Sequence, residues 1–569
     1  MQPIMFSRKL HNSLGMFLSL SRSQSRIRRS AIGGRRWGWR RLDAVLLVCI
    51  ATAITSSAQT FNTIVSFDGT DGAYPNYVTL VQGTDGNLYG TTAAGGTNGF
   101  GTVFKTTTAG GLTSLYSFNN SDGNLPEVGL VQGTDGNYYG TTFKGGTYES
   151  GTVFKITATG ALTSLHSFSG PDGAWPAAPL VQGSNGSLYG TTNQGGTYFF
   201  GTVYKITTKG ALTSLHSFAS GFEGTDPWAP VVLGSDGNFY GTDGAGSPSL
   251  YGVFYQISPA GALTPLGGFY DSNGGAPSGN LVQATDGNFY GTTQIGGANP
   301  SYGTVFQATP SGAITTLHSF ASTDGANPYG GVIQATDGNF YGTTVGGGPY
   351  GYGTVFQLTP SGVLTTLHSF NGTDGANPYG GLLQATDGNF YGVSNGGGTS
   401  FYGTIFRINM GLAPFVKLQA TTGKVGATVP ILGTNVRGAT SVSFNGTAAT
   451  FTATKSKITA RVPAGATTGA VQVKTPTGTL NSNVMFRVTP VISSFSPSSG
   501  PVGTSVVING TSLTQTTAVK FGGVAAPTFT VDSDIQITAI VPAGSKTGRV
   551  VITTPGGTAT STTNFTVTP

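Results

Sequence analysis

The chain of 569 residues is too long for a single compact core, so its length predicts several domains. Only 8% of the residues are charged while 11% are aromatic, and glycine (92) and proline (29) make up about a fifth; this composition favours short strands joined by turns over a disordered chain. The net charge of +6 hides an acidic central part, residues 59–409, with six basic and eighteen acidic residues, which excludes nucleic acid as its partner.

The first 58 residues have the pattern of a removable export signal. A basic stretch (35–41) precedes an apolar run (44–54), and small residues then suit cleavage after Ala58. The run is shorter than the roughly 20 residues that span a bilayer. We therefore expect residues 1–58 to be a signal peptide, and the mature protein to be secreted or held at the cell surface without a membrane-spanning segment.

The only cysteine, Cys49, lies within this apolar run. The residues before it lack the small side chain expected ahead of a lipidated cysteine, so a lipoprotein is not expected. The mature chain then has no thiol for a disulfide, a metal site or a nucleophile. The sequence leaves open whether translation starts at Met1 or at Met16.

Seven copies of one phrase, spaced by 50 or 51 residues, fill residues 59–410. Each copy reads roughly Leu-x-x-Leu-His-Ser-Phe, Asp-Gly-Ala-x-Pro, Leu-Val-Gln-x-x-Asp-Gly-Asn-Phe-Tyr-Gly-Thr-Thr, Gly-Gly and Gly-Thr-Val-Phe-Lys-Ile. So regular a period indicates units that bury their apolar surface against their neighbours. The first residue of the central Asp-Gly or Asn-Gly pair is Asp85, Asp135, Asn185, Asp236, Asp286, Asp337 or Asp387.

Each copy contains four candidate strands, which in the last copy are 381–385, 390–394 and 404–408, with an outer strand of the type found at 364–370. The Asp-Gly pair between the first two predicts a two-residue type I′ hairpin turn. Four antiparallel strands repeated seven times predict a seven-bladed β-propeller, an all-β fold. The array opens with residues 63–67, which match the outermost strand, and closes with 404–408, which match the third. We expect these two segments to pair and close the ring.

The phrase Asp-Gly-Asn-Phe-Tyr-Gly-Thr-Thr, followed by Gly-Gly and Gly-Thr-Val-Phe, resembles the GloVer repeat of exported bacterial tandem-repeat proteins over about residues 61–409. The resemblance implies a secreted or surface location. It implies no particular activity and transfers no catalytic residue.

The tail carries two copies of another pattern, at 411–489 and 490–569. The second copy contains Ser-Pro-Ser-Ser-Gly-Pro-Val-Gly, then Val-Val-Ile-Asn-Gly, and later Ile-Val-Pro-Ala-Gly. It resembles the IPT/TIG module, an immunoglobulin-like β-sandwich. The first copy keeps Gly-Lys-Val-Gly-Ala and Val-Pro-Ala-Gly but lacks the Ser-Pro-x-x-Gly opening. The resemblance implies that both modules act as spacers or adhesive stalks.

The sequence predicts no metal, no cofactor and no catalytic residue. The recurring histidines, His166, His216, His318 and His368, lie on the outer strands of different units, and diverging strands cannot bring them to one ion. Calcium needs six to eight oxygens, whereas each Asp-Gly turn offers one acid. No nucleophile elbow, phosphate-binding loop, dinucleotide fingerprint or zinc motif occurs.

The loops that differ between copies are the best candidates for a ligand site. The loop after the outer-strand phenylalanine and the glycine-rich loop after Tyr-Gly-Thr-Thr are expected on the same side, and aromatic rings with carboxylates there suit a polysaccharide. Alternatively the aromatic rings only cover the ends of the sheets, and the acids only form turns before proline. The candidate ligand-binding residues are the aromatic Tyr74, Tyr77, Trp175, Trp228, Tyr329, Tyr379, Tyr198, Tyr302, Tyr352 and Tyr402 and the acidic Asp71, Asp122, Asp172, Asp324 and Asp374.

These features favour an exported, non-catalytic binding or adhesion protein that engages an extracellular polysaccharide or a surface protein, with the tail modules as spacers. One alternative is a polysaccharide lyase or glycoside hydrolase, which needs two acids, or an acid with Tyr or His, near the mouth of the ring. Another is a structural protein of the envelope or matrix that has no small ligand.

Overall fold

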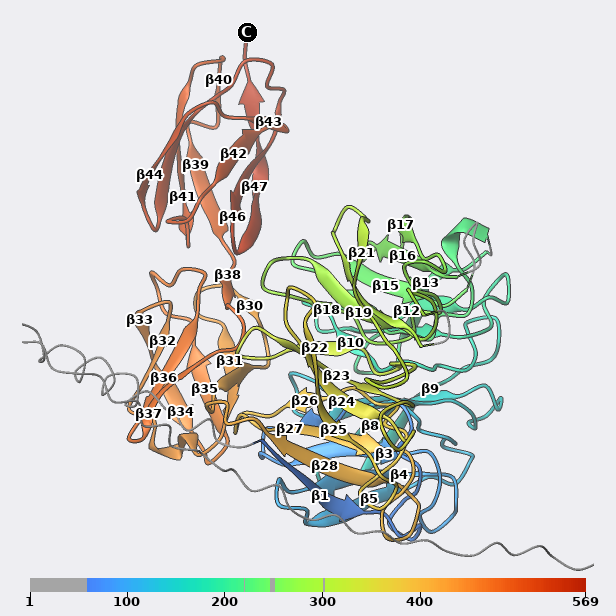
Figure 1. Ribbon diagram of the computed structural model, residues 1–569. Coiled ribbons are helices and arrows are strands. Elements are labelled where there is room, and N and C mark those ends of the chain that lie inside the picture. The colour runs from blue at the N-terminus through green and yellow to red at the C-terminus, as the bar shows by residue number, and fades with distance from the viewer. Residues whose placement is uncertain (1–58, 220, 246–250, 300–301) are drawn as a thin grey trace, which may run out of the picture. The chain divides into compact units, whose positions relative to one another are not determined.

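Figure 1 shows the computed structural model, which describes residues 59–219, 221–245, 251–299 and 302–569. The predicted signal peptide, residues 1–58, lies outside them. Within the described residues the chain is all-β, and its helical elements are two short 3-10 helices, η1 (Gly221–Glu223) and η2 (Val436–Gly438).

The first 28 strands form seven antiparallel four-stranded sheets, which we number 1 to 7 along the chain. The first strands of sheets 1 to 7 are β2 (Val81–Gln82), β6 (Val131–Gln132), β10 (Val181–Gln182), β14 (Val232–Leu233), β18 (Val282–Gln283), β22 (Val332–Gln334) and β26 (Leu383–Gln384). The second strands are β3 (Leu88–Thr92), β7 (Tyr138–Thr142), β11 (Leu188–Thr192), β15 (Phe239–Asp243), β19 (Phe289–Thr293), β23 (Phe340–Thr344) and β27 (Phe390–Ser394). The third strands are β4 (Thr102–Thr106), β8 (Thr152–Ile156), β12 (Thr202–Ile206), β16 (Val253–Ile257), β20 (Thr304–Ala308), β24 (Thr354–Leu358) and β28 (Thr404–Asn409). The fourth strands are β5 (Leu112–Ser117), β9 (Leu162–Ser167), β13 (Leu212–Ser217), β17 (Leu263–Gly268), β21 (Ile314–Ser319), β25 (Leu364–Ser369) and, in sheet 7, β1 (Thr60–Ser66).

The second and third strands are buried on both faces because each sheet packs between two others. Every residue of β3 is buried, and in β4 only Lys105 is partly exposed. The glycine of the repeated Tyr-Gly-Thr-Thr is required by this packing, since a Cβ on Gly90 would lie 2.6 Å from Cζ of Phe104 on the next strand. The fourth strands, by contrast, are exposed or partly exposed along their length, apart from Val65 of β1.

Aromatic rings fill the space between neighbouring sheets. Tyr89 of sheet 1 stacks on Tyr138 of sheet 2 at a centroid distance of 4.0 Å, and Tyr341 of sheet 6 stacks on Phe390 of sheet 7 at 4.2 Å. These residues are fully buried, so the core is a series of aromatic layers rather than one central cluster. This arrangement explains why the sequence needs so many aromatic residues.

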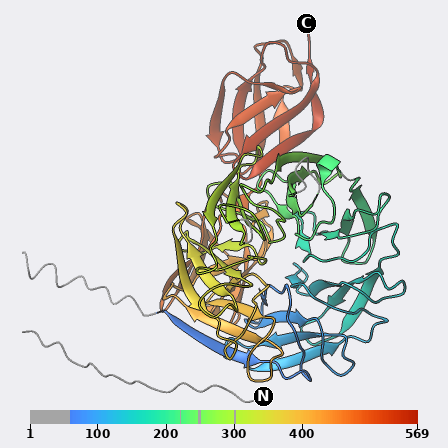
Figure 2. The same cartoon turned by 45° about the vertical axis from the view of Figure 1, so that its right-hand side comes forward.

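The two ends of the repeat array pair with each other, as the sequence predicts. Strand β1 runs antiparallel to β28, with Thr60 opposite Asn409 and Ser66 opposite Thr404. Thr79 of sheet 1 accepts a hydrogen bond through Oγ1 from the backbone N–H of Gly381 in sheet 7, at 3.1 Å. The seven sheets therefore follow one another around a closed ring (Figure 2).

The hairpin turns differ from the expected two-residue type I′ form. In sheet 1 the N–H of Gly86 donates to the carbonyl of Gly83 at 2.9 Å, and the φ angle of Gly86 is positive (86°) while that of Asp85 is not. This is a type I turn followed by a left-handed glycine, a three-residue loop. Asp85 stabilises it directly, because its Oδ1 accepts the N–H of Asn87 at 3.1 Å and its Oδ2 accepts the hydroxyl of Tyr89 at 2.7 Å.

Residues 415–488 form two sheets and a short strand pair, and residues 491–567 repeat the arrangement. In both parts the strand order of the first sheet is the same, and a separate apolar core lies between the sheets, with Phe444 against Phe486 in one part and Phe521 against Phe565 in the other. Both parts are therefore two-sheet β-sandwiches. In the first part, one sheet has the strand order β29 (Val416–Leu418), β31 (Thr428–Gly433), β35 (Lys457–Arg461) and β34 (Phe451–Ala453). The other sheet has the order β33 (Thr447–Ala449), β32 (Ser441–Phe444), β36 (Val471–Thr475) and β37 (Gly478–Asn481), and the separate pair consists of β30 (Thr422–Gly423) and β38 (Arg487–Val488). In the second part, one sheet has the strand order β39 (Val491–Ser496), β41 (Ser505–Thr511), β45 (Gln536–Ile540) and β44 (Phe529–Ser533). The other sheet has the order β40 (Ser499–Gly500), β47 (Gly557–Val567), β46 (Gly548–Thr554), β42 (Ala518–Phe521) and β43 (Val524–Ala525).

Candidate functional site

The two variable loops of each unit lie together, as expected from the sequence. A backbone bridge joins the loop before the first strand of each sheet to the glycine-rich loop after its second strand. In sheets 1 to 7 these bridges are Ala73 to Ala94, Asn124 to Lys144, Ala174 to Gln194, Thr225 to Ala245, Gly275 to Ile295, Ala326 to Gly346 and Ala376 to Gly396.

A repeated proline in the first of these loops directs the residues that follow it to the centre of the ring. Pro75 lies so close to Gly403 of sheet 7 that a Cβ on this glycine would be 2.8 Å from the proline Cδ, and Pro126 lies in the same way against Gly101 of sheet 1. Proline also fixes φ, so the chain leaves each of these contacts in one direction. The residue after the proline in sheets 1 to 7 is Asn76, Glu127, Ala177, Trp228, Ser278, Tyr329 and Tyr379, with Tyr77 as an additional residue in sheet 1.

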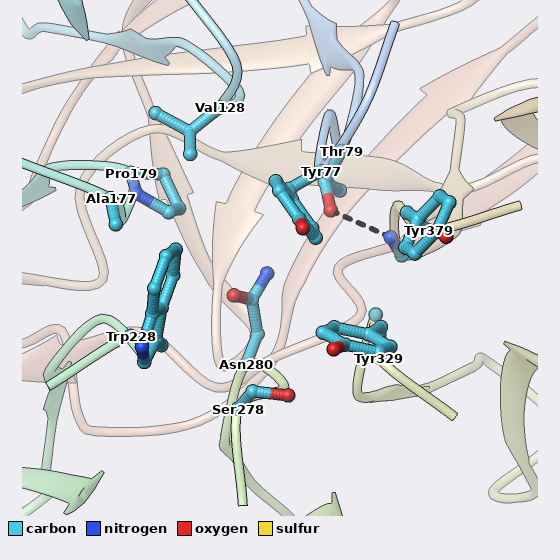
Figure 3. Close-up of a pocket in the computed structure, with 12 residues that line it drawn as sticks. Tyr77, Thr79, Val128, Ala177, Pro179, Trp228, Ser278, Asn280, Tyr329 and Tyr379 are labelled. Carbon is cyan, nitrogen blue, oxygen red and sulfur yellow. Dashed lines mark hydrogen bonds between the residues drawn. The ribbon is translucent and has the colours of Figure 1, made fainter. Parts of the chain in front are cut away.

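All seven loops contribute to one pocket at this centre, which we call the mouth pocket (Figure 3). Its empty space of about 390 Å³ includes the opening to solvent, and the cavity itself measures about 30 Å³. Trp228 lies across it from Tyr77 and Tyr329, and the side chain of Asn280 lies between them. Its lining consists of Tyr77 and Thr79 (sheet 1), Val128 (sheet 2), Ala177 and Pro179 (sheet 3), Trp228 (sheet 4), Ser278 and Asn280 (sheet 5), Tyr329 and Gly330 (sheet 6), and Tyr379 and Gly381 (sheet 7).

Three tyrosines form one wall of the mouth pocket. The ring of Tyr77 lies 5.8 Å from that of Tyr329 and 5.5 Å from that of Tyr379, and Tyr329 and Tyr379 are 5.4 Å apart. Burial, together with Tyr329, Glu127 and Tyr379, raises the pKa of Tyr77, and burial and Tyr379 raise the pKa of Tyr329. Both hydroxyls therefore keep their protons at neutral pH and can donate hydrogen bonds.

The polar groups of the mouth pocket are uncharged. Asn280 supplies an amide, and Thr79 and Ser278 supply hydroxyls; Ser278 accepts a hydrogen bond from the side-chain amide of Gln294 at 2.6 Å. The lining includes no Asp, Glu, Lys or Arg. Its chemistry is that of a hydrogen-bonding site between aromatic rings, without a charge to bind an ion.

Glu127 is the carboxyl group beside the mouth pocket. It precedes Val128 of the lining, its carbonyl accepts the backbone N–H of Tyr77 at 2.9 Å, and its Oε1 accepts the side-chain amide of Asn76 at 3.3 Å. Burial raises its pKa, although the hydrogen bond from Asn76 and the charge of Lys144 oppose this shift. The sequence analysis missed Glu127, and the only available signal was its place directly after the repeated proline.

The predicted aromatic residues fall into two groups. Tyr77, Trp228, Tyr329 and Tyr379 line the mouth pocket. The other six lie outside its lining: Trp175 is linked to Trp228 through Phe143, Tyr74 contacts Tyr402, Tyr302 packs against the core, Tyr352 lies against Gly372, and Tyr198 is 52% exposed.

The predicted acids do not converge on the mouth pocket, because four of them are held by the outer strand of their own unit. Nε2 of His166 lies 2.7 Å from Oδ2 of Asp172, and the same pairs are His318 with Asp324 and His368 with Asp374, both at 3.0 Å. Tyr116 takes the place of the histidine and donates its hydroxyl to Asp122, and in sheet 3 His216 pairs with Glu223. In the outer strand before Asp71, Val65 occupies the position of the histidine, and Asp71 accepts the backbone N–H of Asp68 at 3.1 Å. Their geometry is that of loop anchors, and a ligand-binding role for these acids stays a prediction.

The described residues contain no group of three or more His, Cys, Asp and Glu side chains that could hold a metal ion. In the same part of the chain, no helix is long and apolar enough to cross a membrane.

Several solved structures resemble this chain at low identity. A fungal alcohol oxidase in complex with copper is 14% identical, with 90% of this chain and 100% of that chain covered and a TM-score of 0.43. A surface glycan-binding protein from Prevotella bryantii is 20% identical over 26% of this chain and 38% of its own, with a TM-score of 0.21. The SGBP-B protein of a xyloglucan utilization locus in Bacteroides uniformis is 23% identical over 26% and 48%, with a TM-score of 0.15. None of these three TM-scores reaches 0.5.

None of the curated proteins compared with the sequence matches it. The model of the IPT/TIG domain matches residues 490–567, which confirms the second tail module, while no such match covers the first. The model of the Gloeobacter/Verrucomicrobia repeat matches residues 50–232, 158–334 and 301–483. These matches cover more than half of the sequence, and the chain therefore belongs to the Gloeobacter/Verrucomicrobia repeat family.

Proposed function

We propose that this chain is an exported or cell-surface protein that binds a polysaccharide without transforming it. In this proposal the seven sheets are the blades of a β-propeller, residues 59–410, and the mouth pocket at its centre takes the sugar. Residues 1–58 direct export, and the two immunoglobulin-like parts, 411–489 and 490–569, hold the propeller away from its attachment point.

The observation that carries the proposal is the composition of the mouth pocket. A sugar ring has apolar C–H faces and a polar edge, so it needs flat apolar surfaces with hydrogen-bonding groups between them. Trp228 and the three tyrosines supply the surfaces, while Asn280, Thr79 and Ser278 supply the donors and acceptors.

The experiment is a binding screen of residues 59–569 on an array of glycans and polysaccharides. Trp228→Ala combined with Tyr329→Ala removes surfaces on two sides of the mouth pocket and should lower the retention of the bound glycan about tenfold or more. Tyr270→Ala is the matched control, because Tyr270 is 50% exposed and outside the lining. Unchanged retention of the double variant contradicts the proposal, as does a chain that binds no glycan and captures one specific protein instead.

Glu127 keeps the enzymatic alternative testable, since it is a carboxyl of raised pKa beside the mouth pocket. A hydrolase or lyase would need a second acid or base near it. Incubation of bound polysaccharides with the chain should release no new sugar ends. Release that is abolished by Glu127→Gln would replace the binding proposal with an enzymatic one.

A further inference from the structure

Two lines of aromatic residues lie beside the mouth pocket, one in the loops of sheets 2 and 3 and the other in the loops of sheets 1 and 7. We propose, on the basis of the function proposed above, that the ligand is a neutral polysaccharide bound along the middle of its chain, with sugars on both lines, and not by a chain end held in the pocket.

The first line begins at Trp228 in the pocket. The ring of Phe143 lies 6.1 Å from Trp228 with planes inclined by 20°, and 5.8 Å from Trp175 with planes inclined by 33°. These rings come from the loops of sheets 4, 2 and 3, so three separate segments bring them together. None of the three is buried, so each leaves part of its ring free for a ligand.

The second line begins at Tyr77 on the facing wall of the pocket. Tyr74 lies three residues earlier in the same loop, and its ring meets that of Tyr402 of sheet 7 at 5.7 Å. Tyr74 is 40% exposed and Tyr402 is 37% exposed. Phe401, the neighbour of Tyr402 in the chain, is 74% exposed.

Folding does not account for these aromatic residues. The residue before the repeated proline has a positive φ in all seven units, and in two of them it is asparagine (Asn327 and Asn377), which tolerates this conformation. Tyr74 and Trp175 place a bulky ring there, each at a φ of 58°. Phe401 is likewise left-handed, with a φ of 64°, and is mostly exposed. Bulky side chains at strained and exposed positions indicate a function.

The charges of the mouth pocket and of residues 59–409 indicate which class of polysaccharide binds. The mouth pocket has no charged lining residue, and residues 59–409 carry eighteen acidic against six basic residues. An acidic surface repels a polyanion and lowers its local concentration. A neutral chain with exposed pyranose faces therefore fits this surface better than a uronic-acid or sulfated polymer.

The repeat itself supplies substitutions that test the two lines without disturbing the fold. Trp175→Asn and Tyr74→Asn each install the residue that other units have at the same position, and Asn relieves the strain of the positive φ. Both variants are expected to melt at or above the temperature of the unmodified chain. Trp228→Ala is the corresponding change inside the mouth pocket.

The probes are cello-, xylo- and manno-oligosaccharides of two to six sugars, with β-glucan, xylan and mannan and, for comparison, polygalacturonate. By isothermal titration calorimetry with residues 59–569, the affinity should increase with chain length up to the longest oligosaccharide of the recognised series. Trp175→Asn and Tyr74→Asn should each weaken binding of the hexasaccharide and the polymer about tenfold while leaving the disaccharide unchanged, and Trp228→Ala should weaken all of them.

Two outcomes overturn the inference and leave the proposed function standing. One is an affinity that is already maximal for a disaccharide and insensitive to Trp175→Asn and Tyr74→Asn, although Trp228→Ala abolishes it. The other is a preference for polygalacturonate over every neutral polymer. Absence of binding to all probes, in contrast, contradicts the proposed function itself.

Discussion

Asp243 is the residue at which sheet 4 departs from the other six. In sheet 1 the Oγ1 atoms of Thr92 and Thr102 form a buried hydrogen bond of 2.8 Å between the second and third strands, and five other sheets have the same bond. In sheet 4 the pair is Asp243 and Val253. Valine offers no hydroxyl, so Oδ2 of the fully buried Asp243 has no hydrogen-bond partner among the described residues.

The double substitution Asp243→Thr with Val253→Thr should therefore stabilise the protein at neutral pH. It restores the hydrogen bond of the other sheets and removes a buried carboxyl oxygen, Oδ2, that has no partner, which is expected to be worth about 1–3 kcal/mol. The substitution also removes the hydrogen bond that Oδ1 accepts from the N–H of Ala245 at 3.0 Å. Differential scanning calorimetry of the variant and the unmodified chain at pH 7 measures this as a higher melting temperature. Val253→Thr alone supplies a single hydroxyl and should recover part of the gain.

The same pair of proteins should also differ in pH dependence. Burial raises the pKa of Asp243 well above its ordinary value, so the folded state favours the protonated acid. Its contribution to stability is complete below the unfolded pKa of about 4 and is lost as the pH rises through the folded pKa. The advantage of the double variant should accordingly shrink when the pH is lowered to about 4, and an advantage independent of pH would contradict this account.

At the scale of the element, one side-chain contact joins the outer strand to the loop that follows it in five of the seven units. His318 and Asp324 show it most simply, since the carboxylate pairs with the imidazole through Oδ2 at 3.0 Å and accepts the N–H of Ala321 through Oδ1 at 2.8 Å. In two units the outer strand has neither histidine nor tyrosine at this position, and the pair is absent. Val65 occupies the position before Asp71, and Gly267 occupies it before Asn273. The acid therefore acts mainly by holding the loop in place.

Asp324→Ala should lower the melting temperature more than His318→Val does. The acid makes two contacts, and the loss of its hydrogen bonds is expected to cost about 1–2 kcal/mol, whereas a partly exposed ion pair alone contributes about 1 kcal/mol or less. Thermal unfolding followed by near-ultraviolet circular dichroism measures both variants. Equal losses would show that the imidazole, and not the loop backbone, is the important partner of Asp324.

Within each unit, the sequence could predict the features that recur with the period of the repeat. Strands 390–394 and 404–408 were expected and are found as β27 and β28, since buried apolar patterns and turn signals mark them. The predicted type of turn was wrong. The side chain of Asp85 accepts the backbone N–H of Asn87, and this residue does not need a positive φ. The pairing of histidine with acid was not predicted, since the residues are six positions apart across a turn whose path the sequence does not define.

At the scale of the whole molecule, the period of the repeat again predicts which loops meet but not which residues form the site. The repeat predicts that the loops of different units meet, and Tyr77, Trp228, Tyr329 and Tyr379 do meet in the mouth pocket. The sequence alone did not identify Asn280 or Phe143, because they become part of the site only when sheets far apart in the sequence close into a ring. The contribution of any one residue to the mouth pocket thus depends on closure of the ring of seven sheets.

Closure itself depends on β1, the strand that completes sheet 7. Besides its pairing with β28, β1 carries Phe61, whose ring stacks on His368 of sheet 6 at 3.5 Å and contacts Phe406 of β28 at 5.5 Å. Without β1 the edge of β28 is free to pair with another chain. A chain that begins at residue 68 should consequently melt at a lower temperature and form oligomers.

Size-exclusion chromatography with light scattering, together with calorimetry, compares this chain with one that begins at residue 59. Phe61→Ala in the longer chain is the milder test, because it removes the ring contacts to His368 and Phe406 and leaves the backbone pairing in place. It should lower the melting temperature while the protein stays monomeric. If the chain from residue 68 is a monomer of unchanged stability, β1 does not close the ring, and the mouth pocket does not depend on the pairing of the two ends.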